Sequence, residues 1–137
     1  MNYFVKLNIF GILYAFTLAI QTELMGNVYR ISRLTNMPIN AVEVKIGLMM
    51  LFVFIISTIT FLLISSRYFY KGRLRYFLTI LWIPYFLAFI FLFSSLIPMA
   101  NIDEPPPVLG LILLGIYLAY PFYIAFINFV STKNISE

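Results

Sequence analysis

The sequence predicts an all-α membrane protein whose four transmembrane helices form an up-down bundle with both termini in the cytoplasm. The 137-residue chain is 63% hydrophobic and only 10% charged, whereas about a quarter of the residues in a soluble domain are charged. Uncharged runs of about 20 residues are long enough to cross the hydrocarbon core as helices. The densest group of cations, in residues 67–75 (RYFYKGRLR), separates two such runs, as expected for a cytoplasmic loop. The length fits a single four-helix domain, 1–137, without a separate soluble domain.

The first span is expected at residues 4–22. Its uncharged part begins at Leu7, so it is short unless the preceding residues join the helix and Lys6 extends its ammonium group to the membrane surface. A cleaved signal peptide with Lys6 as its charged segment is the alternative interpretation. We favour a retained span.

An amphipathic helical extension is expected after this span. Leu24, Val28 and Ile31 fall on one side, and polar residues fall on the other. Asn36 and Pro38 are expected to end it, because the residue before a proline is disfavoured in the α region. We expect a short interfacial helix on the outer side of the membrane. The alternative is a binding platform on the outer face, formed by Glu23, Arg30 and Arg33.

The remaining spans are expected at residues 46–66, 76–100 and 108–130. Pro84 predicts a kink in the third span, and the backbone carbonyl that proline leaves unbonded must be satisfied inside a membrane. We therefore expect Pro84 to face protein. Residues 101–107 (NIDEPPP) cannot continue a helix and are expected to form a stiff link.

The orientation follows from the distribution of cations. With residues 67–75 inside, six cations are cytoplasmic and three are outside, which agrees with the positive-inside rule. The inner set is Lys6, Arg67, Lys71, Arg73, Arg75 and Lys133, and the outer set is Arg30, Arg33 and Lys45. We expect a multi-pass protein of the cell inner (plasma) membrane.

Small residues at four-residue spacing mark candidate packing faces, because close approach of helices in a bilayer depends on small side chains. We expect the first and fourth spans to make the closest contacts, either with each other or with a second subunit. The residues concerned are Gly11, Ala15 and Ala19 in the first span and Gly115 and Ala119 in the fourth.

Hydroxyl-bearing residues in the second and fourth spans are candidates for lining a cavity or a pore. The alternative is that each hydroxyl bonds to a backbone carbonyl or to a neighbouring helix. The residues are Ser57, Thr58, Thr60, Tyr117, Tyr120 and Tyr123.

The composition argues against enzymatic chemistry. The chain has no histidine and no cysteine, which are the common zinc and haem ligands and, for histidine, the usual general base at neutral pH. No ionisable residue lies well inside a predicted span, although such residues are the usual sign of transport or catalysis. We predict no catalytic residue, no metal and no cofactor. The net charge of +4 is explained by topology and does not indicate direct binding of nucleic acid.

The remaining candidate site is the basic loop, where Arg67, Lys71, Arg73 and Arg75 could bind anionic membrane lipids or a cytoplasmic protein. The predicted function is a non-enzymatic membrane subunit that oligomerises, or that anchors and regulates a partner. An oligomeric pore and a minor subunit of a larger membrane complex are the alternatives. By size and layout, the chain is similar to the small four-helix membrane proteins that bacteria use in bacteriocin immunity and phage defence.

Overall fold

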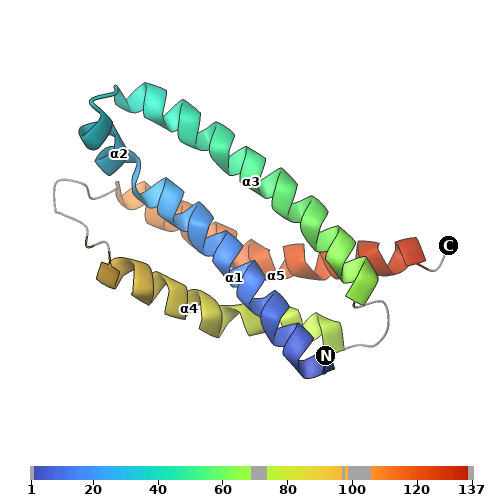
Figure 1. Ribbon diagram of the computed structural model, residues 1–137. Coiled ribbons are helices and arrows are strands. Elements are labelled where there is room, and N and C mark those ends of the chain that lie inside the picture. Colours follow the sequence, from blue (N-terminus) through green and yellow to red (C-terminus); the bar gives the residue numbers. More distant parts are fainter. Residues whose placement is uncertain (1, 69–73, 97, 99–105, 136–137) are drawn as a thin grey trace.

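All the regular secondary structure that the computed structural model describes is helical (Figure 1). The structure describes residues 2–68, 74–96, 98 and 106–135. These residues form five α-helices and one short 3-10 helix, η1, with no strand among them. The elements are α1 (Tyr3–Gly26), α2 (Val28–Thr35), α3 (Ile39–Tyr68), η1 (Leu74–Phe77), α4 (Leu78–Leu96) and α5 (Pro107–Ile135).

Four of the helices, α1, α3, α4 and α5, are long and apolar enough to cross a membrane. This confirms the prediction of four apolar helices and indicates a multi-pass membrane protein. Helix α3 starts directly after Pro38, at Ile39, seven residues before the predicted second span at 46–66. The Pro38 carbonyl accepts bonds from the N–H groups of Ala41 (3.0 Å) and Val42 (3.2 Å), and proline is tolerated at a helix start, where its missing N–H is not needed.

A single asparagine separates α1 from α2. The Asn27 side-chain amide donates to the Glu23 carbonyl at 2.7 Å and to the Glu23 carboxylate at 3.0 Å. Such local bonds compete with the helical ladder, and Asn27 leaves the α region at φ −110° and ψ 17°. The predicted amphipathic extension is therefore a separate helix of eight residues. It ends as predicted at Asn36, which adopts the left-handed conformation with φ 56°.

The helices pack in an order that sequence spacing did not predict. Helix α1 packs most extensively against α4, and α3 packs most extensively against α5. The core lies where the helices converge, with Tyr14 from α1, Phe61 from α3, Trp82 from α4 and Tyr120 from α5 all buried. The Trp82 and Tyr120 rings meet nearly at right angles with their centroids 5.0 Å apart, a favourable aromatic geometry.

The expectation that Pro84 faces protein is wrong. Pro84 lies inside α4 but is exposed, whereas Trp82 and Phe86 are buried. Residue 84 follows residue 82 by about 200° around the helix, so it lies opposite the packed face that Trp82 establishes. The helix continues through the proline to Leu96.

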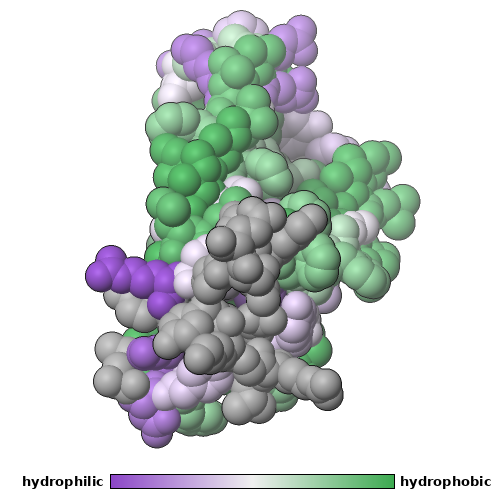
Figure 2. All heavy atoms as spheres, turned by 90° about the vertical axis from the view of Figure 1, so that its right-hand side faces the viewer, coloured by the Kyte–Doolittle hydropathy of each residue, from purple (hydrophilic) through white to green (hydrophobic). Residues whose placement is uncertain are grey.

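Large apolar side chains cover much of the outer surface. Leu111, Phe91 and Phe122 are 73%, 74% and 77% exposed, respectively. Figure 2 shows broad apolar areas on one face, with hydrophilic residues gathered at its upper edge and lower left. Apolar surface of this extent is unfavourable in water and matches a hydrocarbon environment.

Candidate functional sites

The three tyrosines of α5 join this helix to its neighbours. The Tyr120 hydroxyl donates to the Tyr14 carbonyl of α1 at 2.6 Å. The Tyr117 hydroxyl shares a hydrogen bond of 3.1 Å with Thr22 of α1, and the Tyr123 hydroxyl shares one of 2.6 Å with Thr58 of α3. The hydroxyls of the three tyrosines are therefore bonded between helices, which is the arrangement that satisfies a tyrosine inside a membrane.

Two hydroxyls of α3, those of Ser57 and Thr60, bond to backbone carbonyls of α3 itself. Ser57 donates to the Phe54 carbonyl at 3.1 Å, and Thr60 donates to the Ile56 carbonyl at 2.8 Å, so both bond within their own helix. Ser57, Tyr120 and Tyr123 do line a common cavity of about 310 Å³ between α1, α3 and α5. Thr58, Thr60 and Tyr117 do not line this cavity, whose walls are largely apolar.

Sequence reasoning missed a buried polar cluster between α3 and α5. Ser65, Asn128 and Ser131 are 4%, 0% and 1% exposed. Ser65 donates to the Asn128 side-chain carbonyl at 3.1 Å, and Ser131 donates to the Ser65 hydroxyl at 3.0 Å. The available signal was the three-residue spacing of Asn128 and Ser131, which places both on one face of the helix.

Two amides in α1 were also missed as packing groups because they carry no charge. The Gln21 side-chain amide donates to the Met50 carbonyl of α3 at 3.1 Å. The Asn8 side-chain carbonyl accepts a hydrogen bond from the Tyr85 hydroxyl of α4. The Gln21 amide thus connects α1 to α3, and the Asn8 amide connects α1 to α4.

The two sets of small residues predicted as packing faces, one stripe on α1 and one on α5, have different surroundings. Gly11, Ala15 and Ala19 are buried, and a Cβ added at Gly11 would lie 3.2 Å from the Leu81 Cγ of α4. Helix α1 therefore fits closely against the third span, and the alternative in which the first and fourth spans make the closest contacts within the chain is wrong. The face of α5 that meets α1 carries bulky tyrosines instead of small residues.

The stripe on α5 lies on the outside of the bundle. Gly115 and Ala119 are exposed, and a Cβ added at Gly115 would meet no atom within 4 Å. Nothing in the described part of the chain covers Gly115. The second alternative, contact with another subunit, stays a prediction.

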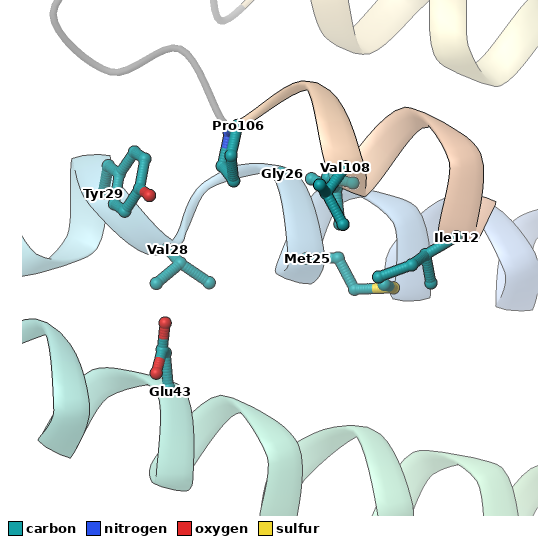
Figure 3. Close-up of a pocket in the computed structure, with 9 residues that line it drawn as sticks. Met25, Gly26, Val28, Tyr29, Glu43, Pro106, Val108 and Ile112 are labelled. Carbon is teal, nitrogen blue, oxygen red and sulfur yellow. The ribbon is translucent and has the colours of Figure 1, made fainter.

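The three residues of the predicted outer platform lie on α1 and α2, and a binding surface formed by them stays a prediction. Arg30 donates to the Pro98 carbonyl at 2.7 Å and so fastens α2 to the segment after α4. Glu23 accepts from Asn27 at 3.0 Å, and Arg33 lies in the last turn of α2. A cavity of about 170 Å³ does lie at this end of the bundle, but its charged wall residue is Glu43 (Figure 3). The sequence had indicated Glu43 only as a marker of the start of the second span.

The basic loop is described only in part. Arg67 is exposed near the end of α3. Lys71 and Arg73 lie outside the described residues, as does the side chain of Arg75. The lipid or partner site at this loop stays a prediction.

No group of three or more histidine, cysteine, aspartate or glutamate residues in the described ranges is arranged to hold a metal ion. The charged groups that the structure describes lie near helix ends. The buried hydroxyls of Tyr120, Ser65 and Ser131 bond to other helices or to their own, whereas the Gln21 side-chain carbonyl is buried without a partner among the described residues. Comparison of the chain with protein-family models, with curated proteins and with solved structures found no match.

Proposed function

We propose that the protein is a non-enzymatic subunit of a membrane assembly, which oligomerises or anchors and regulates a partner protein. The observation that carries this proposal is the outward position of Gly115 and Ala119 on α5. Small residues allow a second helix to approach closely enough for extensive van der Waals contact in a bilayer. The corresponding stripe on α1 is already occupied by α4. On α5, a Cβ added at Gly115 would meet open space, and Ala119 is exposed at the edge of the cavity between α1, α3 and α5.

The proposed topology is an up-down bundle with both termini in the cytoplasm of a cell whose inner (plasma) membrane holds the protein. The excess of cations at residues 67–75 supports this orientation. A common side for both termini is supported by Figure 1, in which the start of α1 and the end of α5 lie toward the right and α2 lies at the upper left. Arg67 and the rest of the basic loop would then face anionic lipid headgroups or a cytoplasmic partner.

The biological process proposed for such a subunit is bacterial defence or bacteriocin immunity, in keeping with its size and four-span layout. The oligomeric pore has less support. A pore needs polar groups that face water, but the hydroxyls of Tyr117, Tyr120 and Tyr123 are bonded to neighbouring helices of the same chain. A minor subunit of a larger complex would use the same face of α5. The experiment below distinguishes it from an oligomer of identical chains.

The test uses the absence of cysteine from the chain. A single cysteine at Leu118, which is 66% exposed and three residues from Gly115 on the same side of α5, is cross-linked in native membranes with a short bifunctional reagent. We expect a cross-linked product, and Gly115→Leu should abolish it because the added side chain holds the second helix away.

Gly110→Leu is the matched control. Gly110 also lies in α5, where an added Cβ would meet open space, but it is turned away from Gly115 by about 140°. A product of twice the chain's mass identifies a second copy, and any other mass identifies a different subunit. Products that persist in the Gly115→Leu variant, or no product at all, would contradict the proposal.

A further inference from the structure

The cavity at the α2 end of the bundle is apolar except at one point. Its volume is about 170 Å³, and it lies where α1, α2, α3 and α5 meet. Met25, Val28, Val108 and Ile112 contribute apolar walls, and Glu43 contributes the one charged group among the residues that line it (Figure 3). The cavity therefore combines an apolar interior with a negative charge at its edge.

The Glu43 carboxylate is available to bind a cation. Its side chain rises from α3 toward Val28 of α2 in Figure 3, and it has no hydrogen-bond or ion-pair partner among the residues that the structure describes. Two cations on these helices are engaged elsewhere. Arg30 donates to the Pro98 carbonyl, and the Lys45 ammonium contacts the Met37 sulfur at 3.9 Å.

The size and aromatic content of the cavity define the ligand further. An apolar protein cavity of about 150 Å³ accommodates benzene, so this cavity holds an apolar body of about one aromatic ring. The ring of Tyr29 forms another part of the wall, and the face of an aromatic ring attracts an ammonium group. A carboxylate, an aromatic ring and apolar walls together match an amine better than a neutral or anionic molecule.

We propose that this cavity binds a small organic ammonium ion, with its apolar body between α1, α2 and α5 and its ammonium group at Glu43. The binding is reversible and involves no covalent step. In the proposed topology, the site opens on the outer side of the membrane. The inference does not depend on the assembly proposed for α5, because none of its wall residues belongs to the stripe at Gly115 and Ala119.

The experiment measures protection of a single cysteine in the cavity. Val108→Cys is introduced into the full chain, because Val108 lines the cavity and is 62% exposed, so a reagent can reach it. The protein is placed in phosphatidylglycerol nanodiscs, whose headgroup carries no ammonium group, and 2-phenylethylammonium is the probe. We expect the amine to slow the reaction with a small maleimide in a saturable way, and the neutral analogue 2-phenylethanol to protect only at much higher concentration.

Two charge variants separate binding in the cavity from partition into the bilayer. Glu43→Gln keeps the shape of the side chain and removes its charge, so the concentration for half protection should rise by about tenfold or more. Glu23→Gln removes a carboxylate at the same end of the bundle that does not line the cavity, and it should leave this concentration unchanged. Equal values in the two variants, or equal protection by 2-phenylethanol, would overturn the proposal.

A further variant keeps the charge and fills the space. Val28→Phe should abolish protection by the amine while circular dichroism shows an unchanged helix content, and retained protection would overturn the placement of the ligand.

Nanodiscs that contain phosphatidylethanolamine test the other source of ammonium groups. Glu43-dependent protection by this lipid alone would overturn the assignment to a soluble amine and identify a headgroup site.

Discussion

Single buried hydroxyls and amides determine which helices stay together. Ser65 is 4% exposed and bonds to both Asn128 and Ser131, so its hydroxyl connects α3 to two positions on α5. Apolar side chains contribute little to helix association in lipid, since the tails of the lipids are equally apolar. Polar contacts of this kind, together with close packing, therefore account for the specificity of the bundle.

Removal of the Ser65 hydroxyl tests this contribution. Ser65→Ala should destabilise the fold by about 1 kcal/mol, because the Asn128 carbonyl and the Ser131 hydroxyl both lose a buried partner. Thermal unfolding in detergent, followed by circular dichroism, measures the loss. Ser94→Ala is the control, because Ser94 is exposed and bonds only to the Phe91 carbonyl of its own helix, at 3.0 Å. Equal effects of the two substitutions would contradict a structural role for the cluster.

The sequence is least informative about the partners of individual polar side chains. The polar character of Ser65, Asn128 and Gln21 is visible in the sequence, but their partners are set by how helices rotate and cross. Hydropathy gives no information about that rotation, because each of the four long helices is apolar around most of its circumference. For the same reason the sequence could not show that Glu43, rather than Glu23, would line the outer cavity.

The individual helices were easier to predict than their pairing. Four apolar runs of sufficient length predicted four long helices, and Asn36 with Pro38 predicted the end of α2. Helix α3 begins seven residues before the predicted second span, because charged residues such as Glu43 and Lys45 lower the hydropathy of a segment without preventing it from being helical. The small-residue stripes identified two packing faces but could not show that α4 would cover the first.

A matched pair of glycine variants tests the packing of α1 on α4. Gly11→Leu should destabilise the monomer by about 1–3 kcal/mol through overpacking, because even a Cβ at Gly11 lies 3.2 Å from Leu81. Gly115→Leu should leave the stability of the monomer nearly unchanged, because its added side chain meets open space. Unfolding of the two variants in detergent gives the comparison. A larger loss for Gly115→Leu than for Gly11→Leu would contradict the observed pairing.

At the scale of the whole molecule, the solvent of the protein is a lipid bilayer. Side chains such as Phe91, Leu111 and Phe122 are exposed over more than two thirds of their surface, which is unfavourable in water and ordinary in hydrocarbon. In a bilayer, a few buried polar contacts and one closely packed helix pair are then enough to determine how the helices pair. Composition alone predicted this environment, while the orientation rests on the count of cations at the two sides.

Cysteine labelling on intact cells tests the membrane-spanning account most directly, because the natural chain contains no cysteine. One variant carries Thr35→Cys at the end of α2, and a second carries Gly72→Cys in the basic loop. A membrane-impermeant maleimide should label position 35 in intact cells and position 72 only after the membrane is permeabilised. Labelling of both positions in intact cells, or of position 72 alone, would contradict the proposed membrane topology.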